Sequence, residues 1–373
     1  MITVMDTSFK TASRQPKYLE IAEAIKADIV TGRLGQNERL ASFAELRTRY
    51  GATPTTVNQV YGVLEREGLI TRERGRGVFV GASRHAATGI MALAGTHFRN
   101  HQQWAYWDAI FHGIESVASD AGFDILLVKN GSNSIQFGKV DGVIFSTEDL
   151  LRHLPAGVPR VSLLAPIEGA ASVSIDDYQG MSTAMGYLLS QGHRKIAYLG
   201  INSRSGANAN SQSLLSDRRL SAYRDCLTAA GIEVDSQRMF LMPTPLSPDG
   251  TSFGGKDVMT GWLRGDWLDL GCTALVAHND DLAIGALEAL IEAGVDVPGQ
   301  VSVVGFDGIE TSDQCVPRLT TVEVPLRQIG AMAAELLIRQ IRAEAGFSIA
   351  EPTCTLLPTR LRICESTAPP RRG

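Results

Sequence analysis

Four side chains suited to reading DNA bases lie within five residues of each other, in the first turns of a predicted helix: Thr55, Thr56, Asn58 and Gln59. Asn and Gln can pair with adenine through two hydrogen bonds, and Thr can meet a thymine methyl group or a phosphate. The apolar residues of the same segment recur at helical spacing and are interpreted as its buried face: Val57, Val60 and Leu64. The polar face is therefore predicted to contact DNA.

Short local signals define the elements that must position these side chains. Ser42 and Glu45 form a capping box, which predicts a helix start, and Gly51 ends that helix. Thr53 caps the next helix, and Pro54 occupies its first position without losing a bonded N–H. Thr53 is also included among the expected DNA contacts.

Two further segments complete this first unit. The stretch from Lys17 to Thr31 is predicted to form an amphipathic helix, and Leu69–Glu73 is predicted to pair with Val78–Gly81 as a hairpin. Helix, turn, helix and basic hairpin together predict a winged helix-turn-helix over residues 1–81, which is a DNA-reading unit.

Arginines surround the predicted reading helix and are expected to meet phosphates or the minor groove: Arg47, Arg49, Arg72, Arg74 and Arg76. The alternative for any one of them is a solvated surface charge. Residues 1–85 carry 13 Lys+Arg against 9 Asp+Glu, a net charge of +4, and the remainder carries 22 against 31, a net charge of −9. A basic head on an acidic body favours nucleic-acid binding at one end.

The head resembles the GntR family of bacterial regulators over roughly residues 16–81. The matching residues are Tyr18, Ile21, Gly32, Leu34, Leu40, Ser42, Leu46, Thr56-Val57, Glu67-Gly68-Leu69 and Gly75-Arg76-Gly77-Val78-Phe79-Val80. The chain departs from the family at Gln36-Asn37, where Pro-Gly is usual, at Ala41, where Pro is usual, and at Pro54, where Arg is frequent. The change at Pro54 removes a frequent DNA contact.

From Ile90 onward, predicted strands alternate with predicted helices, which indicates a parallel α/β sheet. The predicted strands are Ile90–Ala94, Asp124–Val128, Val140–Ser146, Arg160–Leu164, Lys195–Leu199, Met239–Met242, Ala274–Ala277 and Ser302–Phe306. The predicted helices are Tyr106–Ala121, Tyr178–Gln191, Asp217–Ala230, Gly255–Arg264, Asp280–Ala293 and Leu326–Ala345. Ser203–Ser216 is predicted to be a surface loop.

Polar residues directly follow two of these strands. Asn279 is interpreted as a ligand contact, whereas Asp280 is interpreted as the cap of the next helix. Asp307 would be costly as a lone buried carboxylate, so hydroxyl or amine donors of a ligand are its natural partners. For Asp176 two readings stay open, a ligand contact and a helix cap.

This second part resembles the LacI/GalR sensor domain over nearly all of residues 90–367. The matching blocks are VDGVIF at Val140, GHRKIAYLG at Gly192, AHNDDLAIGALEAL at Ala277, VPGQVSVVGFDG at Val297 and RLTTVEVP at Arg318. The resemblance implies two α/β lobes similar to periplasmic sugar-binding proteins, with a ligand in the cleft between them. It also implies ligand contacts by the aromatic pair Tyr106 and Trp107 and by Arg219, with neighbouring Arg218 as a surface charge. For the aromatic pair the alternative is packing in the core or at an interface, and two adjacent helical residues cannot both face the core.

The chain departs from that family in three places. Only 11 residues separate Val128 from Val140, so the helix usual there is expected to be missing, or Asp124–Val128 is not a regular strand. Leu164 and Ala165 stand where many relatives carry an acid, so one sugar contact is expected to be absent. Cys364 stands where relatives often have Arg, which bears on packing.

Composition agrees with a two-part regulator in a reducing cytoplasm. The five cysteines, Cys226, Cys272, Cys315, Cys354 and Cys364, are odd in number and lack metal spacing, so free thiols are expected. No apolar run approaches the roughly 18 residues of a membrane span, and no signal peptide is visible.

We therefore expect an α/β protein with an N-terminal winged helix-turn-helix at residues 1–81, a linker at 82–89, a two-lobed sensor of parallel sheets flanked by helices at 90–367 and a disordered tail at 368–373. The expected function is a ligand-responsive repressor that binds operator DNA as a homodimer and a sugar as effector, without metal or cofactor. The alternative is an enzyme acting on a sugar or nucleotide, although the chain shows no nucleophile elbow, P-loop or dinucleotide glycine fingerprint. An exported binding protein conflicts with the DNA-reading head.

Overall fold

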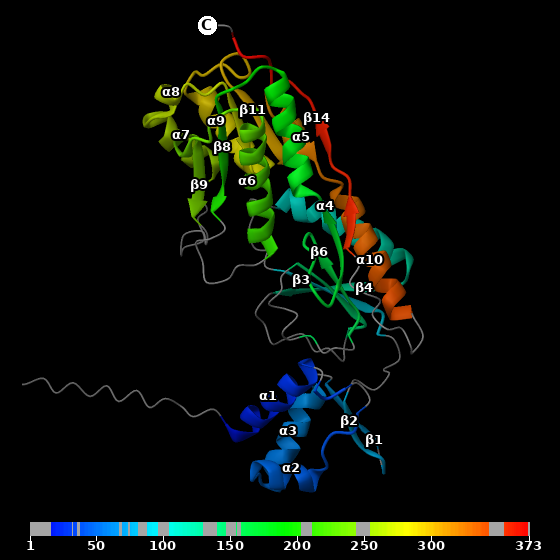
Figure 1. Cartoon of the computed structure of the whole chain (residues 1–373). Coiled ribbons are helices and arrows are strands. Elements are labelled where there is room, and N and C mark those ends of the chain that lie inside the picture. Colours follow the sequence, from blue (N-terminus) through cyan, green and yellow to red (C-terminus); the bar gives the residue numbers. More distant parts are fainter. Residues whose placement is uncertain are drawn as a thin grey trace, which may run out of the picture. The chain divides into compact units, whose positions relative to one another are not determined.

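The computed structural model describes residues 16–31, 33–35, 38–66, 69–73, 75–80, 88–95, 104–129, 140–146, 154, 158–202, 211–243, 254–342 and 354–371. The chain divides into two compact units, a head that comprises residues 1–88 with two short later segments, and a body that comprises most of the chain from Gly89. In Figure 1 the helices of the head are blue, and the elements of the body run from cyan to red.

The head is a winged helix-turn-helix, as predicted. Its elements are α1 (Lys17–Val30), α2 (Phe43–Tyr50), α3 (Pro54–Arg66) and the antiparallel strands β1 (Ile70–Glu73) and β2 (Gly77–Val80). The capping box of Ser42 and Glu45 is present, and Gly51 ends α2 with a φ of 54° that glycine adopts without steric cost. The three helices and the hairpin enclose one apolar core, which includes Ile25, Leu46, Val57, Leu64 and Val80.

The described strands of the body form two sheets. The first has the order β13-β7-β6-β5-β3-β4, all parallel, with β3 (Ile90–Gly95), β4 (Asp124–Lys129), β5 (Gly142–Phe145), β6 (Arg160–Leu163), β7 (Ala171–Ile175) and β13 (Cys354–Leu357). The second has the order β14-β12-β11-β10-β8-β9, with β8 (Ile196–Asn202), β9 (Met239–Pro243), β10 (Ala274–Ala277), β11 (Ser302–Asp307), β12 (Thr320–Glu323) and β14 (Arg360–Arg362). Its strands are parallel except for the antiparallel pair β12 and β14.

Each sheet and its helices make one lobe. Helices α4 (Trp104–Asp120) and α10 (Leu326–Arg342) pack together beside the first sheet. The helices of the second lobe are α5 (Asp177–Ser190), α6 (Ser211–Ala229), α7 (Gly255–Arg264), α8 (Trp267–Leu270) and α9 (Asp280–Glu292). Figure 1 shows α5 and α6 side by side and α7 next to α9.

The chain passes between the lobes three times within the described residues. It leaves the first sheet after β7 to enter α5, returns after β12 to enter α10, and crosses again between β13 and β14. Because β7 and β12 leave their sheets at their carboxyl ends, the carboxyl ends of both parallel sheets face the boundary between the lobes. Ligands of open α/β sheets bind at such an edge.

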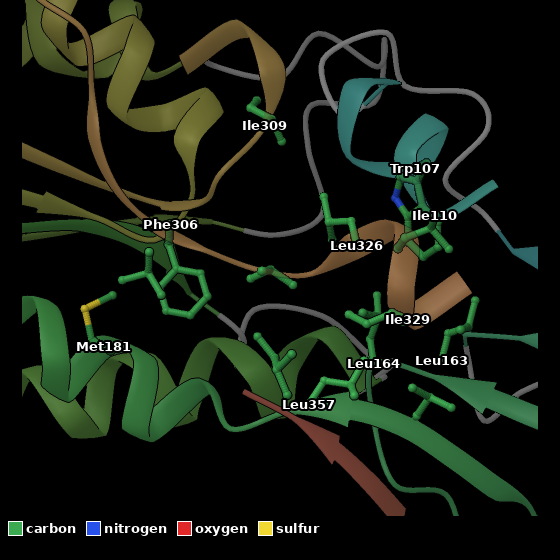
Figure 2. Packing of buried hydrophobic residues seen from close by; sticks show 14 of the residues in the cluster. Trp107, Ile110, Leu163, Leu164, Met181, Phe306, Ile309, Leu326, Ile329 and Leu357 are labelled. Carbon is green, nitrogen blue, oxygen red and sulfur yellow. The ribbon is translucent and has the colours of Figure 1, made fainter. Parts of the chain in front are cut away.

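One apolar cluster extends across the lobe boundary (Figure 2). Trp107 and Ile110 contribute from the first lobe, and Met181 and Phe306 contribute from the second. The lobes therefore share apolar packing beside the strand ends.

Two glycines let α4 and α10 approach backbone to backbone. A Cβ atom added at Gly113 would lie 2.0 Å from the carbonyl oxygen of Arg327, and one added at Gly330 would lie 2.0 Å from that of Ile110. A methyl group at either site can fit only if the helices move apart.

We expect Gly113→Ala to destabilise the body by about 1–3 kcal/mol, the usual cost of overpacking. Gly186→Ala is the matched control, because Gly186 is exposed inside α5 with no atom within 4 Å of the added Cβ. The control should gain about 0.5–1 kcal/mol from helix propensity. All four tryptophans lie in the body, so denaturant unfolding followed by tryptophan fluorescence reports it directly. Equal stability of the two variants would contradict the close approach.

The predicted helices and strands of the body are present, and four strands were missed. β7, β12, β13 and β14 are three to five residues long, and β7 and β12 consist largely of Ala, Ser and Thr rather than the large apolar residues that mark a buried strand. β4 pairs regularly with β3 from Asp124 to Lys129, so the alternative of an irregular strand there is wrong.

Two boundaries need correction. Residues 211–216 are helical and open α6, so the loop predicted from Ser203 to Ser216 is too long. The tail predicted to be disordered from residue 368 is instead held in place as far as Arg371. The Ala368 carbonyl accepts hydrogen bonds at 3.0 Å from His193 Nε2 and from Ser302 Oγ, and Arg371 pairs with Asp296.

Other predictions lie outside the described residues. These are the loose first dozen residues, most of the linker at 82–89, the loop at 203–210 and the short crossover after Lys129.

Candidate ligand site and DNA interface

Arg219 is the centre of a polar cluster at the carboxyl ends of the second sheet. It lies on α6 with only 4% of its surface exposed. Its Nε donates to Asp177 Oδ1 at 2.7 Å, and its Nη1 donates to the carbonyl oxygen of His278 at 2.6 Å. The same Nη1 lies 3.5 Å from Asp307 Oδ1, and the guanidinium carbon lies 3.7 Å from the centre of the Phe306 ring. Arg219 thus joins the start of α5 to the ends of β10 and β11.

The cluster contains two acids and one base, all buried. Burial raises the pKa of Asp177, which Arg219 partly opposes. Burial also raises the pKa of Asp307 well above its usual value, with further contributions from Asp280 and Asp281. Burial alone would lower the pKa of Arg219, but Asp177 and Asp307 more than offset this, so its guanidinium stays charged. One guanidinium faces two carboxyl groups in a desolvated place, where burial favours the neutral form of Asp307 most strongly.

Polar atoms of this cluster lack partners among the described residues. Asp177 Oδ2 and His278 Nδ1 are both buried without a hydrogen bond. Asp307 also has a φ of 119°, a strained conformation for a residue with a Cβ atom. Unsatisfied buried polar atoms and backbone strain in one place are typical of functional sites.

Tyr106 brings the first lobe to this cluster. It lies in the first turn of α4, and its pKa is raised well above the usual value by burial and by Asp307. Arg219 and Asp177 also act on its hydroxyl, so the phenol lies close to the charged groups of the second lobe. Its ring meets the Trp107 ring edge to face, with ring centres 5.6 Å apart.

Of the other predicted ligand contacts, Trp107 lies in the apolar cluster with 4% of its surface exposed (Figure 2). This agrees with the argument that two adjacent helical residues cannot both face the core. Asp176 caps α5 by accepting from the Gln179 N–H at 3.2 Å and pairs with Arg218 at 2.9 Å. Asp176 therefore caps α5, and Arg218 is an exposed residue that forms an ion pair with Asp176.

The helix cap expected of Asp280 is formed by Asn279, and a ligand contact by Asn279 stays a prediction. Asn279 caps α9, since its side chain accepts from the Leu282 N–H at 3.0 Å. Asp280 is fully buried and does not cap: it accepts from the Ile309 N–H at 2.9 Å and from the Thr321 hydroxyl at 2.6 Å. Burial raises the pKa of Asp280 to about 7. Asp280 holds the turn that follows Asp307, and it is a positioning residue.

Sequence reasoning missed Asp177 and His278. Each lies beside a residue that was singled out, Asp177 after Asp176 and His278 before Asn279. Strand alternation could have found His278, because it continues the face of β10 that carries Ala274 and Val276.

The predicted DNA-contacting face is present on the head. Thr53, Thr55, Asn58 and Gln59 are exposed, Thr56 is half-buried, and the buried residues Val57 and Val60 lie on the opposite face of α3. The Thr53 hydroxyl accepts from the Thr56 N–H at 3.2 Å, as expected for a cap.

The described arginines of the head are exposed and rest on neighbouring side chains. Arg72 lies 3.1 Å from Glu65 and over the Tyr61 ring, and Arg76 lies 2.5 Å from Glu73 and over the Phe79 ring. Arg47 and Arg49 occupy the last turn of α2, where Arg49 lies over Tyr50. Arg74 lies outside the described residues.

Three further properties of the described residues concern their thiols, membrane spans and metal sites. Their cysteines are all free thiols, as predicted. No described helix is both long enough and apolar enough to cross a membrane. No group of three or more His, Cys, Asp or Glu within the described ranges is arranged to hold a metal ion.

Comparisons with known proteins match both units. The family described as "Bacterial regulatory proteins, gntR family" matches residues 17–80, and the "Periplasmic binding protein-like domain" matches residues 185–367. The chain is 31% identical over 256 residues to the HTH-type transcriptional regulator GalR of Escherichia coli (strain K12), covering 62% of this chain and 68% of that protein. It is 26% identical over 357 residues to the arabinose metabolism transcriptional repressor of Geobacillus stearothermophilus, covering 87% and 91%. A structure of the transcriptional regulator CelR in complex with cellobiose is similar with a TM-score of 0.60 and 25% identity, covering 91% and 99%.

A winged helix-turn-helix head joined to a two-lobed periplasmic-binding-protein-like body defines a DNA-binding transcriptional regulator. The chain belongs to the LacI/GalR family of bacterial transcriptional regulators, and its head is of the gntR type. These relatives are regulators and repressors, so the enzyme alternative is set aside.

The buried Arg219 pair gives a direct test of the site's electrostatics. Arg219→Met would leave Asp177 and Asp307 buried without a cation, which typically costs about 3–5 kcal/mol. Arg218→Met is the matched control one residue away, because its ion pair with Asp176 is exposed and worth about 0–1 kcal/mol. Denaturant unfolding followed by tryptophan fluorescence compares the two. A loss below about 1 kcal/mol for Arg219→Met would contradict the proposed burial of the charges.

Proposed function

We propose that this regulator is a repressor whose affinity for operator DNA is controlled by a small uncharged sugar or polyol bound at the Arg219 cluster. We further propose that it acts as a homodimer on a two-fold operator in the cytoplasm, where the DNA is.

The observation that carries this proposal is the unsatisfied polar cluster at the lobe boundary. Arg219 supplies hydrogen-bond donors, and Asp177 Oδ2 and the weakly bonded Asp307 supply acceptors. A sugar hydroxyl both donates and accepts, so one hydroxyl can bridge such groups. Tyr106 adds an aromatic ring from the opposite lobe, which can cover an apolar sugar face.

The comparisons support a sugar as the effector. One relative is named for arabinose metabolism, and one similar structure holds cellobiose. Arabinose and cellobiose are both uncharged and rich in hydroxyl groups.

The site also gives a mechanism for control. A ligand shifts a regulator only if it binds two conformations unequally. Contacts to Tyr106 from one lobe and to Arg219 and Asp307 from the other are complete only at one lobe angle. The ligand would therefore select that angle and alter how two DNA-reading heads are spaced in a dimer.

Asp307→Asn tests the ligand site. The amide keeps the size of the side chain but replaces one carboxyl oxygen by an NH2 group, and leaving a buried hydrogen-bond partner unsatisfied costs about 1–3 kcal/mol. We expect sugar affinity to fall about 10- to 100-fold, whereas operator affinity without sugar should stay within a few-fold. Asp269→Ala, an exposed acid in α8, is the control. The measurement is operator release against sugar concentration, followed by fluorescence anisotropy of labelled DNA.

Two results would count against this proposal. An unchanged sugar response in the Asp307 variant would place that residue outside the site. Lost operator binding together with a lowered melting temperature would make it a structural residue instead.

The head gives a second test. Asn58 is exposed on the reading face of α3, so Asn58→Ala should relax base preference at one position in each half-site. Arg76→Ala is the contrasting variant, because loss of a phosphate contact should weaken all sequences alike and flatten the salt dependence by about one ion. Selection of binding sites from a random DNA pool, read by sequencing, compares both with the parent. An unchanged site profile for Asn58→Ala would remove its base-reading role.

A further inference from the structure

His278 lies in the proposed ligand site, and its ring nitrogens form no hydrogen bond with any residue that the structure describes. It directly follows β10, and only 8% of its surface is exposed. Its backbone is fixed on both sides, because its N–H donates to the Leu199 carbonyl at 2.7 Å and its carbonyl accepts from Arg219 Nη1 at 2.6 Å. Its Nδ1 is buried and lacks a hydrogen-bond partner within the described ranges.

A second buried histidine of the same lobe shows what a structural role looks like. His193 has 1% of its surface exposed, and both of its nitrogens are bonded. Its Nδ1 lies 2.9 Å from the Thr273 hydroxyl, and its Nε2 lies 3.0 Å from the Ala368 carbonyl. Because that carbonyl can only accept, His193 must carry its proton on Nε2, and Nδ1 accepts from Thr273. A histidine that only supports the fold is satisfied in this way, and His278 is not.

Strand alternation places the His278 ring on the side of Arg219. Ala274 and Val276 of β10 belong to the apolar cluster that includes residues of α5 and α6, whereas Leu275 and Ala277 face the opposite cluster. The hydrogen bond from His278 to Leu199 continues the pairing of β10 with β8, so the alternation extends to His278. Its ring therefore points to the face that carries α6, where Arg219 lies.

The ring is neutral. Burial and the positive charge of Arg219 together lower the pKa of His278 well below its usual value. A neutral imidazole offers one donor and one acceptor. The neighbouring groups offer the Arg219 donors and the carboxyl oxygens of Asp177 and Asp307, and Arg219 is already paired with Asp177 at 2.7 Å.

We propose that His278 contacts the ligand and determines specificity, by hydrogen-bonding one hydroxyl of an uncharged ligand next to the hydroxyl that Arg219 and Asp307 bind. This rests on the proposed function of the same site. Two adjacent hydroxyls of a ligand complement the Arg219 guanidinium, the His278 imidazole and the carboxyl groups, because each hydroxyl can donate to an acceptor and accept from a donor. An anionic ligand, such as a sugar phosphate or a uronic acid, would find the Arg219 cation already paired with Asp177 and is rejected.

The test uses the full chain and two variants of His278. His278→Phe keeps an aromatic ring but removes both nitrogens, and His278→Asn keeps a polar amide near the place of Nδ1. The probes are arabinose, ribose and cellobiose, together with ribose 5-phosphate and glucuronate as charged counterparts. Thermal shift first identifies the probe that raises the melting temperature of the parent protein, and calorimetry then gives its affinity for each variant.

We expect an uncharged probe to bind, and the charged counterparts to give no shift. His278→Phe should weaken the binding probe about 10- to 100-fold, whereas His278→Asn should stay within about 10-fold of the parent protein. Without ligand, His278→Phe should melt at or above the parent temperature, since it replaces an unsatisfied buried polar group by an apolar one. His193→Phe is the matched control: it should lower the melting temperature because two hydrogen bonds are lost, and leave the affinity unchanged at temperatures below melting.

The outcomes separate this inference from the proposed function. If Asp307→Asn loses the probe and His278→Phe binds it like the parent protein, the role of His278 is refuted and the proposed function stands. If His278→Phe melts several degrees lower without ligand, as His193→Phe does, the ring is structural and the inference is refuted. Tighter binding of a charged counterpart refutes the ligand class. If no sugar binds the parent protein, the proposed function fails, and the inference fails with it.

Discussion

The body of this regulator depends on a guanidinium that is buried with its partners fixed. Arg219 is held by Asp177, by the carbonyl oxygen of His278 and by the Phe306 ring, which belong to three different elements of the second lobe. A buried charge is tolerated only when it is paired and hydrogen-bonded. Asp177 alone would satisfy that requirement, so Asp307 is a second carboxylate that folding does not need.

Asp307, the second acid beside Arg219, costs the fold free energy when no ligand is bound. Asp307 is strained in its backbone, weakly bonded to Arg219 and desolvated, and each of these features costs free energy in the absence of a ligand. Asp280 keeps the residue in place by holding the turn after it through the Ile309 N–H. Gly305 makes room for this support, because a Cβ atom there would lie 2.1 Å from Asp280 Oδ1. The second lobe thus holds a fixed polar cluster at the place where we propose that the ligand binds.

The sequence predicted the elements with strong local signals and missed those fixed by tertiary contacts. The capping box at Ser42 and the apolar period of α3 depend on residues a few positions apart, so they could be read directly. β7 and β12 are buried on both sides by chain segments far away in sequence, and their small side chains carry no such signal. Among the candidate ligand contacts, Arg219 was predicted from the resemblance to the sensor domain, and Asp307 was predicted from its position at the end of a strand. That Asn279 rather than Asp280 caps α9 could not be predicted, because adjacent polar residues at a helix start both suit a cap. Only the contact of Asp280 with Thr321, 41 residues away, separates their roles.

We propose that the Arg219 cluster and the DNA-reading head are linked through one ligand-dependent equilibrium. Linkage is reciprocal, so a sugar that changes operator affinity by some factor must have its own affinity changed by operator DNA by the same factor. Calorimetric titration of the binding sugar into the full chain, with and without saturating operator DNA, measures this factor directly. The account predicts different sugar affinities in the two titrations, and it predicts that their ratio equals the change in operator affinity caused by the sugar. Equal sugar affinities for the free and the DNA-bound protein would contradict it.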